Sequence, residues 1–436
     1  MHRLGVFAIL CRETLRAAAV PLHLLRYLPR RHKHREEARR LLDRGLVHTE
    51  RGNLDAREMF RRALGNPDEP PRSLFLACGE PSGERHALAL IEALRETMPD
   101  LEITAIGGSE LESNGVRLLT NLADHAVMGI LAVFRRIPFY CGLMARYLAY
   151  LDRAKPDLVL LIDNPGLNML LAEQAKARGI PVLYYICPQY WAWGPWRMQR
   201  FRSCVDGAIS ILPFEPSLFW KAGVPTAYAG HPLLPKAPEP APEPRDPLLV
   251  ILPGSRQAEI ERHLLPMVAL FDKLKQGCPE ARAVIVQQNP QRLARIRDLL
   301  GEHCNGSLEL RGGDPFPVLR HARLALVKSG TSSLQTAMCR TPEVVVFKLG
   351  GFSETVFAHN FISVPWIAAP NLVAGRTALP EFCFHSDKHW NEVFAAMRRL
   401  WDAGDARTEQ LGALDEIRAR LAGRGAAAEA VRWICP

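Results

Sequence analysis

Two loops in the second half of the sequence combine residue types that suit the binding of a phosphorylated ligand. The first, Pro253-Gly254-Ser255-Arg256, follows the apolar run 248–252. Gly254 lets the backbone approach an anion, Ser255 can cap the helix that follows, and Arg256 can form two hydrogen bonds to a phosphate. A plain turn with a solvated arginine is the alternative interpretation.

The second loop is Lys328-Ser329-Gly330-Thr331-Ser332-Ser333-Leu334-Gln335, after the apolar run 323–327. Small hydroxyl residues and glycine between a strand and a helix form a nest of backbone N–H groups that binds pyrophosphate. A simple helix N-cap is the alternative. Because both loops belong to the same half of the chain, they could hold the two ends of one nucleoside diphosphate.

An aspartate in the first half is the candidate for proton transfer. Asp163 follows the apolar run 158–162, and a carboxylate at the carboxyl end of a parallel strand is well placed to act as a general base. The alternative is a turn-forming Asp before Asn164-Pro165-Gly166. His231, in Gly230-His231-Pro232, is either structural or catalytic.

The elements that position these residues follow an α/β plan. Continuous apolar runs, rather than alternating ones, predict parallel sheets covered on both faces. A Gly-rich turn, Cys78 to Glu84, joins the first strand to a helix at about 85–98. The predicted strands are 73–77, 103–106, 157–162, 182–186 and 207–212, then 248–252, 283–287, 323–327 and 343–347.

Two α/β domains facing each other across a cleft therefore account for most of the chain. We expect a first domain at 71–234, a Pro-rich linker at 235–247 and a second domain at 248–436. A helix at about 415–433 closes the second domain. Phosphorylated ligands bind such folds outside the carboxyl ends of the strands.

Residues 1–70 form a helical extension of different composition. An apolar stretch containing Pro21 precedes the basic cluster Arg30–Arg35, and two short helices fit 36–50 and 54–64. The two helices resemble a single tetratricopeptide repeat without its partners. A helical hairpin packed on the main body, a partner-binding module and a membrane-surface anchor all remain open.

Composition limits the class of partner. The 436 residues are 48% hydrophobic and 23% charged, with a net charge of +9, which favours an anionic partner. Nucleic acid is the weakest candidate, because no basic stripe interleaved with aromatic residues occurs beyond residue 70. The ten cysteines include no Cys-x-x-Cys pair and indicate reduced thiols in a cytoplasmic protein. No apolar run reaches the roughly 18 residues needed to span a bilayer.

One segment is unusually apolar and has two interpretations. Residues 124–144 form either a buried helix or an exposed patch for lipid, with Arg135, Arg136 and Arg146 reaching headgroup phosphates. The candidate lipid-contacting residues are Val127, Met128, Ile130, Val133 and Phe134.

Several short motifs, in order, resemble the lipid-A-disaccharide synthase family over about residues 72–435. The motifs are Glu80-Pro81-Ser82-Gly83, Ala126-Val127-Met128-Gly129-Ile130, Ile162-Asp163, Trp191-Ala192-Trp193, Leu212-Pro213-Phe214-Glu215, Gly230-His231-Pro232, Leu252-Pro253-Gly254-Ser255-Arg256, Ser329-Gly330-Thr331 and Pro370-Asn371-Leu372-Val373-Ala374-Gly375-Arg376. The first 70 residues lie outside this resemblance.

The resemblance implies a GT-B fold of two Rossmann-like domains and an inverting glycosyl transfer without metal or other cofactor. The implied donor is UDP-2,3-diacylglucosamine and the acceptor is 2,3-diacylglucosamine 1-phosphate, joined through a β-1,6 bond with release of UDP. Both substrates carry acyl chains, so the implied location is the cytoplasmic face of the inner membrane. A homodimer with a swapped C-terminal segment occurs in the family, and the sequence is silent on it.

The resemblance also implies roles for particular residues. Asp163 matches the family's catalytic aspartate, which deprotonates the acceptor hydroxyl. Arg256 and Ser329-Gly330-Thr331 would neutralise the departing UDP. Glu80 and Ser82 match the first Gly loop, and Asn371 and Arg376 match a further substrate-binding signature.

Four positions depart from the family's pattern. Glu84 stands where Asp is usual, Gly166 replaces a second Asp, and Gly194 replaces an Arg for which Arg197 could substitute. Gln335 stands where a Glu is the expected ribose ligand, and a charged hydrogen bond is worth roughly 1–2 kcal/mol more than a neutral one.

Two other functions remain as rivals. One is a different UDP-sugar enzyme on the same fold, either a glycosyltransferase for a soluble acceptor or a 2-epimerase. The other is a non-catalytic scaffold, suggested by the four departures and the N-terminal helices.

Overall fold

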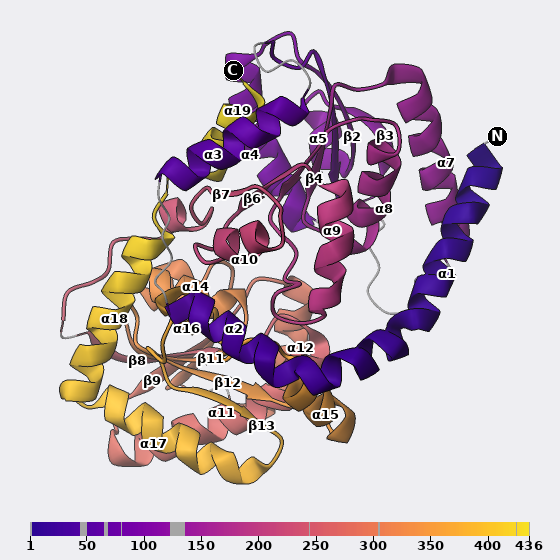
Figure 1. Ribbon diagram of the computed structural model, residues 1–436. Helices are drawn as coiled ribbons and strands as arrows, with labels where there is room; N and C mark the ends of the chain where they lie inside the picture. Colours follow the sequence, from indigo (N-terminus) through magenta and orange to yellow (C-terminus); the bar gives the residue numbers. More distant parts are fainter. Residues whose placement is uncertain are drawn as a thin grey trace. The chain divides into compact units, whose positions relative to one another are not determined.

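The computed structural model describes residues 2–43, 50–64, 69–79, 81–122, 136–243, 245–303, 306–423 and 425–435. The chain forms two compact units, each built on a parallel sheet (Figure 1). The first unit comprises Met1–His34, Leu46–His231 and Gly423–Pro436, and the second comprises Arg35–Gly45 and Pro232–Ala422. The predicted α/β class with two parallel sheets is confirmed.

The sheet of the first unit has, among the described residues, seven parallel strands in the order β3-β2-β1-β4-β5-β6-β7. Its strands are β1 (Ser73–Cys78), β2 (Glu102–Gly107), β3 (Arg117–Asn121), β4 (Leu158–Ile162), β5 (Val182–Tyr185), β6 (Gly207–Ser210) and β7 (Thr226–Tyr228). β1 pairs with both β2 and β4, with Leu76 in register with Ala105 on one side and Leu160 on the other.

Helices cover both faces of this sheet, which is why its strands are apolar on both sides. Leu74 and Leu76 are buried in one cluster with Leu90 and Leu94 of α4, whereas Phe75 contacts Tyr147 of α7 at a ring distance of 4.8 Å. The helices are α1 (His2–Tyr27), α3 (Glu50–Ala63), α4 (Pro81–Thr97), α5 (Ser109–Ser113), α7 (Ile137–Ala154), α8 (Pro165–Lys176), α9 (Met198–Cys204), α10 (Glu215–Lys221) and α19 (Ala426–Ile434).

The sheet of the second unit has six described strands in the order β10-β9-β8-β11-β12-β13, again parallel. The strands are β8 (Asp246–Leu252), β9 (Arg282–Gln287), β10 (Leu308–Gly312), β11 (Ala322–Lys328), β12 (Glu343–Lys348) and β13 (Glu381–Phe384). The helices are α11 (Gln257–Gly277), α12 (Pro290–Leu300), α13 (Phe316–Leu319), α14 (Thr331–Met338), α15 (Phe352–Phe361), α16 (Ala369–Ala374), α17 (Trp390–Trp401) and α18 (Asp405–Leu421).

The C-terminal region forms two helices instead of the single helix expected at 415–433. α18 ends at Leu421, and the chain then passes through Gly423, where an added Cβ would lie 2.5 Å from the Cα of Gly230. α19 packs on α3 and α4, and Trp433 is buried against Phe60 at a ring distance of 5.4 Å. Residues 423–436 therefore belong to the first compact unit, whereas the sequence assigned them to 248–436.

The N-terminal extension also divides between the units. α2 (Arg31–Asp43) crosses the boundary at residue 34, while α3 belongs entirely to the first unit. α3 contacts β6 and β7, with Phe60 fully buried. The two helices expected to form one hairpin are thus assigned to different compact units.

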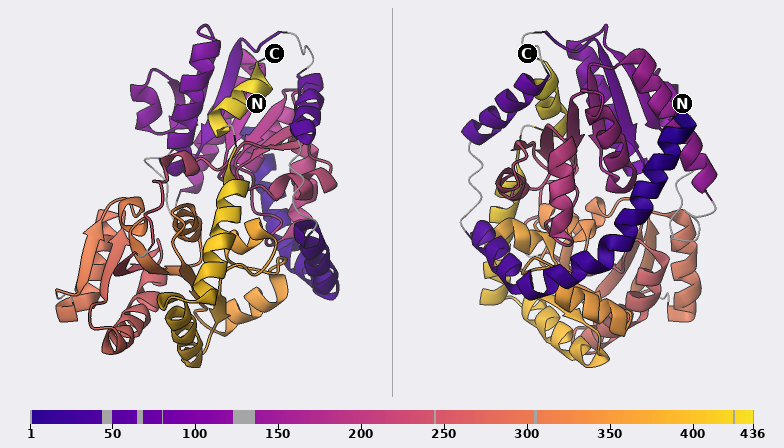
Figure 2. Two further views of the ribbon diagram at one scale, coloured as in Figure 1. Left: turned by 90° about the vertical axis from the view of Figure 1, so that its left-hand side faces the viewer. Right: turned by 45° about the vertical axis from the view of Figure 1, so that its right-hand side comes forward.

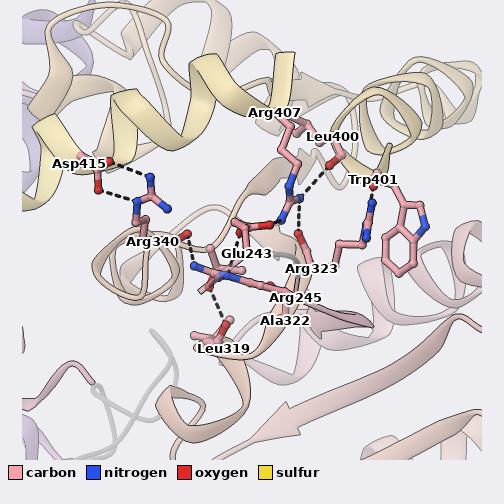
Figure 3. Close-up of polar contacts among 11 residues, drawn as sticks. Glu243, Arg245, Leu319, Ala322, Arg323, Arg340, Leu400, Trp401, Arg407 and Asp415 are labelled. Atoms are coloured by element: carbon pink, nitrogen blue, oxygen red, sulfur yellow. Dashed lines mark hydrogen bonds and ion pairs between the residues drawn. The ribbon is translucent and has the colours of Figure 1, made fainter. Parts of the chain in front are cut away.

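A buried polar network fixes the end of the predicted linker to the second unit (Figure 3). The buried Arg407 of α18 donates to both oxygens of Glu243, at 3.1 and 2.9 Å, and to the backbone oxygen of Arg323 at 2.7 Å. Arg245, also buried, donates to the backbone oxygen of Arg340 at 2.9 Å. The chain just before β8 is therefore held by charge-assisted hydrogen bonds.

Candidate functional site

The first candidate site lies where the strand order of the first sheet reverses. β1 and β4 are neighbours there, and each leads into a helix on its own side of the reversal. Gly79 follows β1 and Asp163 follows β4, so both residues lie at the carboxyl ends of these strands. This is the position at which open α/β sheets bind their ligands.

The backbone holds Asp163 in a defined conformation. Its φ is +50°, in the left-handed region that non-glycine residues rarely adopt. Its backbone oxygen accepts hydrogen bonds from Asn168 Nδ2 at 2.7 Å and from the Tyr184 hydroxyl at 2.5 Å. These two hydrogen bonds, from residues of α8 and β5, offset the cost of the strained backbone. They fix the position of the Asp163 main chain, from which the half-buried side chain extends.

Glu215 is a second carboxyl group at the same edge of this sheet, and sequence analysis assigned it no role. It is buried, accepts from Trp191 Nε1 at 3.1 Å and accepts from the backbone N–H of Leu212 at 3.2 Å. Burial raises the pKa of Glu215 to about 8, and the charge of Asp163 adds to the rise. A mostly neutral Glu215 thus joins the loop after β5 to the loop after β6.

Arg197 lies close to the position of the missing family arginine. Its guanidinium stacks 3.7 Å from the ring centroid of Trp193 and 4.4 Å from that of Tyr190. Gly194 has a φ of +69°, and a Cβ there would lie 2.8 Å from Arg197 Nε. The substitution of Arg197 for an arginine at 194 stays a prediction, and this geometry is compatible with it.

Two other residues of the first unit serve its packing. Glu84 is buried and its Oε1 accepts from the backbone N–H of Leu111 at 2.9 Å. His231 is buried, and burial together with the nearby His86 lowers its pKa to about 4. A neutral, enclosed imidazole favours the structural interpretation of His231.

The second candidate site lies at the reversal of strand order in the second sheet. β8 and β11 are neighbours there, and the loops 253–256 and 329–331 follow them. The topology therefore brings together the two loops that the sequence proposed for phosphate binding. α14 begins at Thr331, so its N-terminus faces the same edge of the sheet.

Glu259 organises this second site and was missed by sequence analysis. Its Oε2 accepts from the backbone N–H groups of Ser255 and Arg256, both at 3.2 Å, and its Oε1 pairs with Lys328 Nζ at 2.8 Å. Burial opposes ionisation, but Lys328 and the two N–H groups lower the pKa of Glu259 overall. The signal in the sequence was the N-cap to N3 spacing from Arg256 to Glu259.

The residues of the second unit that were predicted to bind substrate differ in what their side chains contact. Arg256 is 69% exposed, with only a 3.5 Å contact to Glu259. Ser329 is buried and its hydroxyl donates to the backbone oxygen of Ile367 at 2.7 Å, while Thr331 is exposed and Gln335 half-buried on α14. Ser255, Arg256 and Thr331 are therefore the exposed side chains at these loops.

The side chains of Asn371 and Arg376 form hydrogen bonds and an ion pair with other residues of the second unit. Asn371 is buried; its Nδ2 donates to Leu379 and Glu381, and its Oδ1 accepts from the backbone N–H groups of Ala378 and Leu379. Arg376 pairs with Glu416 at 2.6 Å and lines a cavity of about 220 Å³ with Arg399 and Gln410. This cavity includes no residue of the two loops.

The remaining predicted residues carry no side-chain description. Glu80 and the candidate lipid-contacting residues Val127, Met128, Ile130, Val133 and Phe134 lie outside the described residues, and Ser82 is placed only as part of α4. In the described part of the chain, no group of three or more His, Cys, Asp or Glu side chains is arranged to hold a metal ion.

Two parallel-sheet domains, each with its loops at a reversal of strand order, are the components of the GT-B fold. The fold is shared with Acinetobacter baumannii MurG (16% identity, TM-score 0.50, covering 83% of this chain and 98% of that one). It is also shared with a putative UDP-N-acetylglucosamine 2-epimerase from Listeria monocytogenes (13% identity, TM-score 0.53, 82% and 94% covered).

Residues 74–429 match the family described as lipid-A-disaccharide synthetase. The chain is 34% identical over 379 residues to the lipid-A-disaccharide synthase of Myxococcus xanthus, covering 84% of this chain and 97% of the relative. It is 33% identical to that of Anaeromyxobacter dehalogenans, covering 81% and 94%. The chain belongs to the lipid-A-disaccharide synthase family and is a hexosyltransferase, as the sequence motifs predicted. Among the described helices, none has the length and apolar character required to cross a bilayer.

Proposed function

We propose that this enzyme condenses UDP-2,3-diacylglucosamine with 2,3-diacylglucosamine 1-phosphate, forming the β-1,6-linked disaccharide 1-phosphate and UDP. The observation that carries the proposal is the position of Asp163 at the strand-order reversal of the first sheet, in a member of this family. Its strained backbone is held by two hydrogen bonds, as expected where a carboxylate must be fixed before the reaction.

In the proposed reaction the acceptor's 6-hydroxyl oxygen attacks the anomeric carbon of the donor. The bond from that carbon to the UDP oxygen breaks, and the hydroxyl proton passes to the Asp163 carboxylate. Attack opposite the leaving group inverts the configuration and gives the β linkage. General-base catalysis of this kind contributes about 10²–10⁴-fold to the rate.

The second unit would hold the nucleotide. Arg256 has an exposed guanidinium beside the loop after β8, and the N-terminus of α14 begins at Thr331. Both are suited to the negative charge that develops on the departing UDP. Gln335, on α14, would accept a hydrogen bond from the ribose. Since Asn371 has its donors and acceptors occupied by the chain, we assign it to shaping the segment between α16 and β13.

Because both proposed substrates carry acyl chains, we propose that the reaction takes place at the cytoplasmic face of the inner membrane, where residues 127–134 would contact lipid. The test is an acceptor-dependent UDP-release assay with detergent-dispersed substrates and mass analysis of the product. Disaccharide formation with the acylated pair supports the proposal. Equal activity on UDP-N-acetylglucosamine without acyl chains would favour another UDP-sugar enzyme.

A further inference from the structure

The long N-terminal helix α1 lies outside the residues that match the family, yet it is packed on the first unit. The N-terminal part of α1 lies beside α7 (Figures 1 and 2). Val6 and Ile9 on its inner face are buried, and a Cβ added at Gly5 would contact Leu148 of α7 at 3.4 Å. One face of α1 is therefore already occupied by the protein.

Ion pairs hold the middle of the inner face of α1 against α8 and α9. Glu173 of α8 pairs with Arg12 and Arg16 of α1 and with Arg200 of α9, the last two at 2.8 and 2.7 Å. Glu13 of α1 pairs with Arg200 at 3.0 Å. These ion pairs join one side of α1 to α8 and α9. They therefore fix which side of α1 faces the first unit.

Aromatic contacts fasten the C-terminal end. His23 stacks on Trp196 at a ring distance of 6.0 Å, and the buried Tyr27 meets the same ring at 5.7 Å. The helix is thus held at its start, middle and end, and its opposite face has a fixed outward direction.

That outward face is a continuous apolar stripe. Leu4, Phe7, Leu15, Leu22 and Leu25 are between 48% and 76% exposed. With the exposed Cys11 and Ala18 they follow one another at spacings of three or four, so they lie on one side of the helix. The stripe is about 32 Å long at 1.5 Å per residue. We call Leu4, Phe7, Cys11, Leu15, Ala18, Leu22 and Leu25 the α1 stripe.

The charges around the stripe have one sign. Arg26, Arg30 and Lys33 are exposed at and just beyond the end of α1. In residues 2–34 the sequence contains one acidic residue, Glu13, and it is engaged in the ion pairs described above. An apolar stripe next to exposed cations matches the surface of an anionic lipid bilayer.

We propose that α1 lies in the plane of the membrane interface, with the α1 stripe inserted among the lipids and the adjoining cations on anionic headgroups. A second copy of the chain is a poorer occupant, because it would bring the same cations to the contact. The predicted lipid-contacting segment 127–134 is a different part of the sequence. The contact is separate from that segment and does not depend on the proposed reaction.

The test measures binding of the full-length protein to phosphatidylcholine vesicles with and without phosphatidylglycerol. The double variant Phe7→Ser/Leu15→Ser removes two large side chains from the stripe. We expect its partition coefficient on anionic vesicles to fall about tenfold or more. The matched control, Leu54→Ser/Met59→Ser, removes exposed apolar side chains from α3 and should stay within about twofold of wild type.

The cations are tested by Arg30→Gln/Lys33→Gln, which should remove most of the preference for anionic vesicles. Wild-type binding by the stripe variant would overturn the proposal. So would a dimer in sedimentation analysis that the stripe variant dissociates while vesicle binding is unchanged. Turnover of detergent-dispersed substrates by the stripe variant should equal that of wild type, which separates failure of this contact from failure of the proposed reaction.

Discussion

Gly79 and Asn164 are packed so closely that a Cβ at position 79 would lie 1.6 Å from Asn164 Nδ2. The first residue follows β1, and the second is next to Asp163 after β4. The contact joins the two loops that flank the strand-order reversal of the first sheet. Only glycine fits at position 79 while Asn164 keeps its place, so the loop that carries the proposed base leaves no room for a larger residue there.

Replacing Gly79 with alanine should therefore displace Asn164 and, through the backbone, Asp163. We expect the rate of UDP release to fall at least about tenfold, because small displacements of a catalytic group are costly. Overpacking should also lower the free energy of unfolding by about 1–3 kcal/mol. The control is Gly142→Ala on α7, where no atom lies within 4 Å of the added Cβ. Normal kinetics in Gly79→Ala would contradict this role.

The raised pKa of Glu215 predicts a pH-dependent stability. Between about pH 5 and 8 the folded protein keeps the proton on Glu215 that the unfolded chain releases, so stability falls as pH rises. The contribution has a slope of at most about 1.4 kcal/mol per pH unit. In denaturation curves measured across this range, Glu215→Gln should remove that part of the slope. Glu96→Gln, at an exposed position on α4, should leave the slope as it is. Identical slopes for wild type and Glu215→Gln would refute the prediction.

Two glutamates of the Pro-rich segment should differ sharply in their contribution to stability. Glu243 accepts two hydrogen bonds from the buried Arg407, so Glu243→Ala leaves a buried guanidinium without its counterion. We expect a loss of about 2–4 kcal/mol in the free energy of unfolding. Glu239 is 92% exposed and 3.9 Å from Arg418, so Glu239→Ala should cost under about 0.5 kcal/mol. Equal losses from the two variants would show that the network of Figure 3 is not stabilising.

Gln335 should limit the affinity for UDP. If this position contacts the ribose as proposed, a glutamate there would accept a charged hydrogen bond, so Gln335→Glu should tighten UDP binding about tenfold. Titration calorimetry with UDP measures the change. Gln276→Glu, at an exposed position near the end of α11, adds the same charge elsewhere and should have little effect. Unchanged affinity in Gln335→Glu would mean that this side chain does not contact the ribose.

The strands that were predicted correctly are those buried on both faces. β4 and β5 are fully buried, and their sequences are uninterrupted apolar runs. β3, β10 and β13 were missed because each lies at an edge of its sheet and is only partly buried, so each mixes polar and apolar residues. β7, also at an edge, is fully buried but has only three residues. The break before α19 coincides with a close contact between Gly230 and Gly423, which are far apart in sequence.

In the candidate sites, too, the features that local sequence could not predict are those that depend on residues far apart in the chain. Loops that follow a strand could be placed at its carboxyl end from local sequence, and the topology brought 253–256 and 329–331 together. Glu215 gave no comparable signal, and for Glu259 the only local signal was its N3 spacing from Arg256. The environment of these two carboxyl groups depends on Trp191 and Lys328, which are 24 and 69 positions away. Burial and long-range pairing, rather than residue type, define what these two carboxyl groups do.

The most direct measurement compares Asp163→Asn with Asp157→Asn in the acceptor-dependent UDP-release assay. Both aspartates adjoin β4, but Asp157 lies at its amino end, where it accepts from the backbone N–H groups of Arg72 and Ser73 at 2.9 Å. If Asp163 is the base, Asp163→Asn should lower the rate about 10²–10⁴-fold with UDP affinity unchanged, while Asp157→Asn keeps most of the activity. An Asp163→Asn enzyme that forms disaccharide at a rate close to wild type would contradict the account.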